Sequence, residues 1–166
     1  VAHIAALGKT ITTDVNDAGL LETLKLVREA GGDGFTQRCD VRDYSQLTAL
    51  AQDCEEKLGG IDIIVNNAGV ASGGFFSELS LEDWDWLLGV NTKGLVNGVV
   101  AFIPRMNAQD FHSDLVDTAS IASLLTVENS PAYVASKFAA LGMTEVLDLQ
   151  LQAIKSPVTV HAVCPA

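Results

Sequence analysis

Short apolar runs alternate along the chain with longer segments that have the pattern of helices. The short runs have the length of strands, and two of them, IDIIV and VTVHAV, are rich in β-branched residues, as expected of strands buried on both faces. We expect strands over residues 9–13, 34–39, 61–66, 113–119 and 157–164, and helices over residues 17–30, 43–58, 80–104 and 131–154. This order of elements predicts an α/β fold: a doubly wound, Rossmann-like parallel sheet with helices on both faces.

Local signals agree with several of these boundaries. Glycine pairs at 31–32 and 59–60 suit helix ends, and Ser80 with Asp83 has the spacing of a capping box in which aspartate replaces the usual glutamate. No repeat or linker interrupts the 166 residues, so we expect a single domain over residues 1–166. The segment VAHIAALG has the pattern of the last turns of a helix, yet no strand precedes it, so the expected sheet is incomplete at this end.

The composition narrows the classes of partner. A net charge of -11 argues against nucleic acid, because affinity for phosphate backbones comes from clustered lysine and arginine. We find no secretory signal and no apolar run of the length that spans a bilayer, so we expect a cytoplasmic protein without membrane contact. Cys39, Cys54 and Cys164 are widely spaced and have no histidines at ligand spacing. They predict neither disulfides nor a metal site, and fit small core residues in a reducing compartment.

Polar residues follow the expected strands, and open parallel sheets bind ligands at the carboxyl ends of their strands. Asp14 follows the first expected strand, where a carboxylate can accept hydrogen bonds from both ribose hydroxyls of an adenosine. The same carboxylate would repel a 2′-phosphate, which favours NAD over NADP. The alternative is that Asp14, Asn16 or Asp17 only caps the following helix.

The next two strand ends carry further candidates. Asp40 could reach an adenine edge while Val41 packs against the ring, although a plain turn would explain the same residues. The segment NNAG begins at Asn66, and its side-chain amides could tie neighbouring strands together. Ala68 and Gly69 leave the backbone bare enough for a flat ligand to approach closely.

The fourth strand is followed by Ser120, and Tyr133 and Lys137 come next, four residues apart. On a helix this spacing places both side chains on one face, where an ammonium favours the phenolate form of the tyrosine. Such a tyrosine can accept or release a proton near neutral pH. The alternative is an ordinary exposed tyrosine beside a solvated lysine.

Five segments in this order resemble the classical short-chain dehydrogenases/reductases. They are NNAG at 66–69, VNTKG at 90–94, TAS at 118–120, YVASK at 133–137 and a Cys-Pro ending at 164–165. The resemblance runs along the whole chain and implies hydride transfer between a nicotinamide cofactor and an alcohol or carbonyl substrate. The spacing of Asn91, Ser120, Tyr133 and Lys137 argues against the alternative of an acidic α/β domain of flavodoxin type.

The resemblance also implies roles for single residues. Tyr133 would be the acid/base, Lys137 would promote its ionisation and bind the nicotinamide ribose, and Ser120 would donate a hydrogen bond to the substrate oxygen. Asn91 would hold a water that links the lysine to solvent. The implied cofactor site is lined by Asp14, Asp40, Val41, Asn66, Ala68, Gly69, Tyr133 and Lys137. Val15 is not basic, which again favours NAD.

Three departures from the family pattern limit this interpretation. The glycine-rich turn that normally binds the pyrophosphate is absent. The sequence stops at Ala166, where the family continues into a substrate-covering segment. Asp117 replaces the asparagine that many members have at this position. We therefore expect a fragment of an NAD-dependent alcohol dehydrogenase or carbonyl reductase, with little or no NAD binding by the 166 residues alone. The alternative is a truncated, non-catalytic relative that acts as a binding or assembly module.

The helices expected at 80–104 and 131–154 are more apolar than contact with one sheet requires. This surplus favours subunit contact, and the family commonly forms oligomers through these helices. We expect a homodimer or homotetramer. Burial of both helices on two sides within one chain would explain the same pattern.

Overall fold

The computed structural model describes residues 8–166, so the helix expected within VAHIAALG lies outside the described residues. Each of the other expected elements is present, with ends shifted by at most a few residues. The elements are β1 (Lys9–Asp14), α2 (Asp17–Glu29), β2 (Asp33–Arg38), α3 (Tyr44–Leu58), β3 (Ile63–Asn66), α4 (Leu81–Leu88), a π-helical turn (Gly89–Lys93), α5 (Gly94–Asn107), β4 (Ser113–Thr118), a 3-10 turn (Ile121–Ser123), α6 (Pro131–Ala153) and β5 (Val158–Val163).

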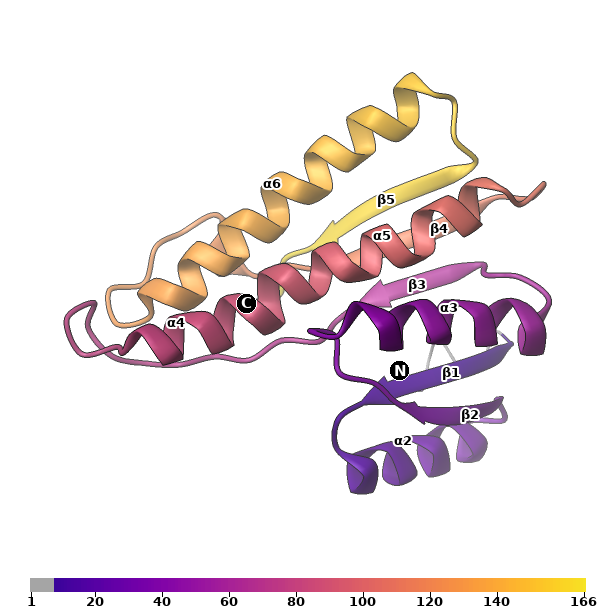
Figure 1. Ribbon diagram of the computed structural model, residues 1–166, viewed down its shortest axis with the longest axis horizontal. Helices are drawn as coiled ribbons and strands as arrows, with labels where there is room; N and C mark the ends of the chain where they lie inside the picture. Colours follow the sequence, from indigo (N-terminus) through magenta and orange to yellow (C-terminus); the bar gives the residue numbers. More distant parts are fainter. Residues whose placement is uncertain (1–7) are drawn as a thin grey trace.

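All strand pairs are parallel, and the strands form two sheets, β1-β2 and β3-β4-β5. Figure 1 shows β1 between β2 and β3, and within the described residues no ladder joins β1 to β3. The predicted α/β class is confirmed, but the single sheet that we expected is split in two.

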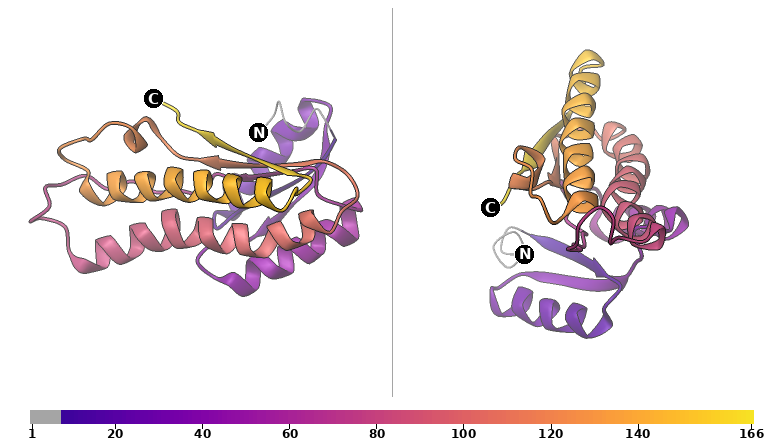
Figure 2. Two further views of the ribbon diagram at one scale, coloured as in Figure 1. Left: turned by 90° about the horizontal axis from the view of Figure 1, so that it is seen from above. Right: turned by 90° about the vertical axis from the view of Figure 1, so that its left-hand side faces the viewer.

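The helices are distributed unevenly over the sheets. Helices α3, α5 and α6 lie on one side of the strands and α2 lies on the other, as the view from above shows (Figure 2). Helix α2 packs against β1 and β2. The second face of the three-stranded sheet has no helix among residues 8–166, and Ile63, Val65 and Val163 are exposed there. The expected cover on both faces is therefore seen only in part.

The main core lies between the strands and the helices α3, α5 and α6. Burial alternates along β4, where Ser113, Leu115 and Asp117 face the helices, as expected of a strand with one packed face. The buried core residues are Cys39, Leu47, Leu50, Ala51, Cys54, Ile61, Ala101, Phe102, Ile103, Met106, Leu115, Leu151, Val158 and Val160. Cys39 and Cys54 are free buried thiols, as predicted. The same prediction is wrong for Cys164, which is only partly buried and lies outside this core.

Helix α4, the π-helical turn and α5 form one continuous helix, Leu81–Asn107. By length and composition this helix could cross a membrane, which corrects our expectation that no such segment exists. Half of its most apolar window is buried in the fold, and it packs against α3 and α6. Its apolar character is that of a central core helix, because its buried side faces other elements of the same chain.

Candidate active site

The parallel strands place their carboxyl ends at one edge, where Figure 1 shows the arrowheads pointing to the same side. The predicted site residues follow these ends: Asp14 after β1, Asp40 and Val41 after β2, residues 66–69 after β3, and Ser120 after β4. Tyr133 and Lys137 lie in the first turns of α6. The structure therefore places the predicted set along a single edge of the strands.

Lys137 is buried, with 6% of its surface exposed. Its Nζ donates a 2.7 Å hydrogen bond to the carbonyl oxygen of Thr118, and it lies 5.7 Å from the centroid of the Tyr133 ring. Burial lowers the pKa of Lys137, because the charged ammonium loses water, while the nearby Cys164 thiol acts in the opposite direction. The alternative of a solvated lysine is wrong.

Tyr133 is half-buried, with Pro131 at the start of its helix. Its carbonyl oxygen accepts a 2.7 Å hydrogen bond from Ser136 Oγ. Within residues 8–166 no hydrogen bond joins the Tyr133 hydroxyl to Ser120 or Lys137. The tyrosine and the lysine thus share one face of α6, as predicted.

Asn91 lies in the π-helical turn and is buried. Its amide accepts from Val70 N at 2.8 Å and donates to Val70 O at 2.9 Å and to Ser136 Oγ at 3.0 Å. These bonds join the segment after β3 to α6. A π-helical turn is rare and frequently marks a functional position, and here it directs the asparagine inward between the two elements.

Ser120 is held against α6 by a second serine. Ser123 Oγ accepts from Ser120 N at 3.2 Å and donates to the Lys137 carbonyl oxygen at 2.8 Å. Ser120 Oγ accepts from Ala122 N at 3.1 Å, which uses one lone pair of the hydroxyl oxygen. The Ser120 hydroxyl proton has no acceptor among the described residues and is available to a ligand.

Gly69 leaves an open position beside the lysine and the asparagine. A methyl group built on Gly69 would lie 3.5 Å from Asn91 Oδ1 and 3.7 Å from Lys137 Nζ. Gly69 and the neighbouring Ala68 are exposed. The bare backbone therefore borders both polar groups, as expected for close approach of a flat ligand.

The two asparagines of NNAG connect β3 to β4. Asn66 Nδ2 donates to Asp117 Oδ1 at 2.8 Å, and Asn67 Oδ1 accepts from Thr118 Oγ1 at 3.2 Å. This confirms the expectation that the amides tie neighbouring strands together. The Asn66 side chain is engaged in the fold, which leaves its backbone as the part that can contact a cofactor.

Asp14 is exposed at the end of β1, and its Oδ1 accepts from Asn16 N at 2.9 Å. The cap of α2 is Asn16, whose Oδ1 accepts from Gly19 N at 3.2 Å. The capping alternative is therefore confirmed for Asn16, whereas neither Asp14 nor Asp17 is the cap. Asp14 retains a second carboxylate oxygen that is free among the described residues.

Asp40 is paired with Arg42, whose Nη2 lies 2.7 Å from Asp40 Oδ2. Hydrogen bonds from Arg42 hold the pKa of the Asp40 carboxyl below its usual range. The turn that we gave as the alternative is present, with Asp43 N donating to Asp40 O at 2.9 Å. Val41 O accepts from Asn97 Nδ2 at 2.9 Å, so α5 holds Val41 in place.

Four residues of the site were not predicted from the sequence: Thr118, Ser123, Ser136 and Arg42. Thr118 and Ser136 lie inside the TAS and YVASK segments, so the segments pointed to them, but their roles depend on contacts between distant elements. Nothing in the sequence pattern distinguished Ser123 or Arg42. Among residues 8–166 no group of histidine, cysteine and acidic side chains could hold a metal ion.

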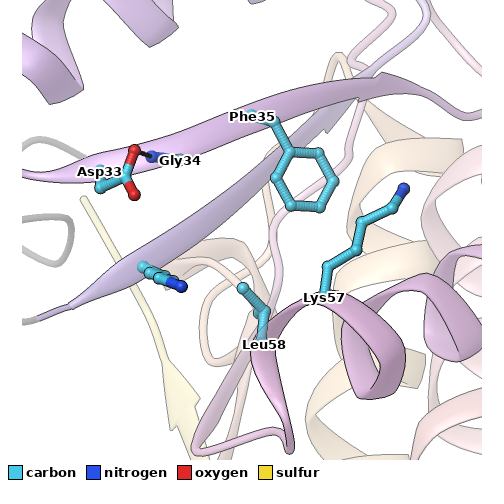
Figure 3. A pocket seen from close by; sticks show the side chains of 6 residues that line it. Asp33, Gly34, Phe35, Lys57 and Leu58 are labelled. Carbon is cyan, nitrogen blue, oxygen red and sulfur yellow. Dashed lines mark hydrogen bonds between the residues drawn. The ribbon is translucent and has the colours of Figure 1, made fainter.

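A hollow of about 230 Å³ lies at the opposite edge, where β1 and β2 begin. Figure 3 shows Lys57 and Leu58 at the end of α3 facing Phe35, and Lys57 Nζ lies 4.7 Å from the centroid of the Phe35 ring. Its lining residues are Lys9, Asp33, Gly34, Phe35, Lys57 and Leu58. None of them belongs to the predicted site.

The arrangement brings a buried ammonium, a phenol, a serine hydroxyl and a bare glycine backbone to one edge of parallel strands.

A family model described as short chain dehydrogenase matches residues 1–166. A curated relative described as "CLA biosynthesis dehydrogenase/reductase", from Lactiplantibacillus plantarum, is 33% identical over 157 residues, which is 95% of this chain and 55% of that protein. The chain spans about half the length of the curated relatives that it matches first.

Solved structures agree with this match. The crystal structure of a short chain dehydrogenase/reductase from Burkholderia phymatum in complex with NAD has a TM-score of 0.92 and 38% identity, covering 95% of this chain and 56% of that one. LigD from Sphingobium sp. strain SYK-6, in the apo form, has a TM-score of 0.91 and 25% identity, covering 99% of this chain and 73% of that one. The chain belongs to the short-chain dehydrogenase family.

Proposed function

We propose that the protein transfers a hydride between NAD and a small alcohol or carbonyl substrate, with Tyr133 as acid/base. The observation that carries the proposal is the buried Lys137 ammonium 5.7 Å from the Tyr133 ring centroid. A cation in a partly dehydrated site favours the phenolate, and a phenolate can take the proton of an alcohol. In the opposite direction the phenol returns this proton to the oxygen of a carbonyl.

Ser120 and Asn91 complete the proposed set. Ser120 would donate its free hydroxyl proton to the substrate oxygen and stabilise the charge that develops there. Asn91 holds Val70 and Ser136, and its Oδ1 lies beside the open position at Gly69. We propose that a water held by Asn91 links Lys137 to solvent.

The described residues fit part of a nicotinamide cofactor. The bare Gly69 backbone next to Lys137 Nζ is an open cradle, and Lys137 has two further N–H donors that could bind ribose hydroxyls. When bound, NAD supplies the hydride acceptor. Asp14 has a free carboxylate oxygen for the adenosine ribose, and its charge disfavours a 2′-phosphate, so we propose NAD in preference to NADP. The Burkholderia phymatum relative, solved in complex with NAD, supports this preference.

The decisive experiment is Tyr133→Phe in the full-length protein that carries this sequence. Turnover with NAD and a panel of alcohols and ketones should fall at least about 100-fold, because a general acid/base typically contributes this much. Cofactor affinity, measured by fluorescence titration, should change less than about threefold, since the ring remains. Turnover close to that of the unmodified protein would refute the acid/base role.

We further propose a cytoplasmic homodimer or homotetramer. Phe138, Val146 and Leu149 of α6 and Val100 of α5 are exposed apolar side chains that a second subunit could cover. The free buried thiols of Cys39 and Cys54 fit a reducing compartment. The dehydrogenase and reductase names of the relatives give no support to a non-catalytic assembly module.

A further inference from the structure

A fully buried carboxyl group, that of Asp117, lies beneath the candidate site at the end of β4. Its Oδ1 accepts a 2.8 Å hydrogen bond from Asn66 Nδ2 on β3. Its Oδ2 lies 2.8 Å from Thr144 Oγ1 on α6. The carboxyl group thus connects two strands to the helix that carries Tyr133 and Lys137.

Counting protons at Thr144 indicates the protonation state of this carboxyl group. Thr144 Oγ1 also lies 2.8 Å from the Ala140 carbonyl oxygen. A hydroxyl group has one proton, so it can donate to Ala140 O or to Asp117 Oδ2 but not fully to both. If Asp117 carries a proton, it donates to Thr144 Oγ1, Thr144 donates to Ala140 O, and both short contacts are hydrogen bonds. If Asp117 is ionised, the single proton of Thr144 can serve only one of the two contacts. In the other contact two oxygens lie 2.8 Å apart with no proton between them.

The surroundings of Asp117 are also unfavourable to an anion. Asn66 of β3 and Thr144 of α6 face it, and Ala162 of β5 is its register partner. Burial raises the pKa of Asp117, and this effect outweighs its two hydrogen bonds, which act in the opposite direction. The charged groups of the neighbouring elements are engaged elsewhere or exposed: Asp114 with His161, Lys137 with Thr118 O, Asp148 with Gln152, Arg105 with Glu55, and Glu145 at the surface.

We propose that Asp117 is a neutral carboxylic acid at neutral pH that donates its proton to Thr144 and so positions α6 against the end of β4. Loss of this proton would leave a buried anion and weaken the contact that holds α6. The protonation state of Asp117 does not depend on the proposed function. The consequence of this protonation for catalysis by Lys137 and Tyr133 does rest on the proposed function. Thr118, the next residue, supplies the carbonyl oxygen that holds Lys137 Nζ, so a shift of this strand end would reach the lysine directly.

The first test measures the proton itself on the full-length protein that carries this sequence, without cofactor or substrate. The carboxyl carbon of Asp117 is observed by NMR after ¹³C labelling of aspartate and is assigned by its disappearance in Asp117→Asn. We expect the resonance of a neutral acid that does not shift between about pH 5 and about pH 7. Titration near the ordinary carboxyl pKa of 3.8 would overturn the proposal, whether or not the protein is an enzyme.

The second test compares stability against pH. An acid with a raised pKa binds more protons folded than unfolded, so stability is lost as the pH rises above 3.8 towards the pKa in the fold. In this window each pH unit should raise the unfolding equilibrium constant of the unmodified chain about tenfold relative to Asp117→Asn. The asparagine amide can donate to Thr144 and accept from Asn66, so this variant keeps the hydrogen bonds without an ionisable group.

Asp114→Asn is the matched control, on the same strand but on the other face. Hydrogen bonding from His161 lowers the pKa of Asp114, so here the carboxylate stabilises the fold and its contribution is lost as the pH falls. The two variants should therefore differ from the unmodified chain with opposite pH trends. Parallel trends would overturn the proposal. If Asp117→Asn does not fold, infrared absorption of the protonated carboxyl in the unmodified chain decides the question.

Discussion

The Lys137 ammonium lies 2.7 Å from the carbonyl oxygen of Thr118 and joins α6 to the end of β4. This bond leaves two N–H donors of Lys137 without a partner among residues 8–166, and Gly69 and the Tyr133 ring lie beside them. A charge held by one carbonyl group and largely removed from water is costly for the fold. Such an arrangement is typical of functional sites, where a charge is retained for its chemistry.

Lys137→Met should separate this chemistry from stability. The substitution keeps the length of the side chain and removes the charge, so turnover of the full-length protein should fall at least about 100-fold. Thermal unfolding should change little, because loss of the bond to Thr118 is offset by relief from burying a charge. Lys93→Met, at an exposed lysine of the π-helical turn, is the control and should leave both quantities unchanged. Equal losses in the two variants would contradict the role of Lys137.

Asp14→Ala should change the choice of cofactor. The carboxylate at the end of β1 repels a 2′-phosphate, so its removal should improve the ratio of kcat/KM for NADP over NAD, by roughly tenfold or more. Asp17→Ala removes a nearby exposed carboxylate of α2 and is the matched control. Steady-state kinetics of the full-length protein with both cofactors give the ratio. An unchanged ratio in Asp14→Ala would remove this residue from the site.

The elements of this fold could be predicted because each is marked by local residues. The run IDIIV alone contains three isoleucines and a valine, and the capping box predicted from Ser80 and Asp83 is present with both of its hydrogen bonds. The split of the strands into two sheets was not predicted, because the alternation of strands and helices does not specify which strands hydrogen-bond to one another.

The contacts that build the site could not be predicted in this way. The π-helical turn that directs Asn91 to Val70 depends on packing between α4, α5 and α6, and nothing in GVNTK differs from an ordinary helical turn. Asp40 was expected to face a ligand, yet its carboxylate binds Arg42, because an arginine two residues away competes for the same oxygens. Side-chain partners of this kind depend on geometry that residue types alone do not specify.

Gly94 and Val41 offer a test of how the site is supported. A methyl group on Gly94 would lie 2.6 Å from Val41 Cγ2 and 3.1 Å from Val41 Cβ, closer than carbon atoms can approach. Gly94→Ala should therefore destabilise the fold by about 1–3 kcal/mol in chemical denaturation. In Val41→Ala the clashing methyl is removed, so the double variant should be more stable than the sum of the two single changes predicts. Additive losses would show that the two residues do not touch.

The cysteines test the core of the chain without any assumption about its activity. Burial raises the pKa of the Cys54 thiol to about 11, and burial also raises the pKa of Cys39. At pH 8 about one Cys54 thiol in a thousand is ionised, and the reactive form of a thiol is the thiolate. Cys164 is partly exposed, so a disulfide reagent should modify it first and should reach Cys39 and Cys54 only on unfolding. Mass spectrometry of the native chain after brief labelling should find one modified cysteine of the three. Rapid labelling of Cys54 in the folded chain would contradict the packing of α3 against α5.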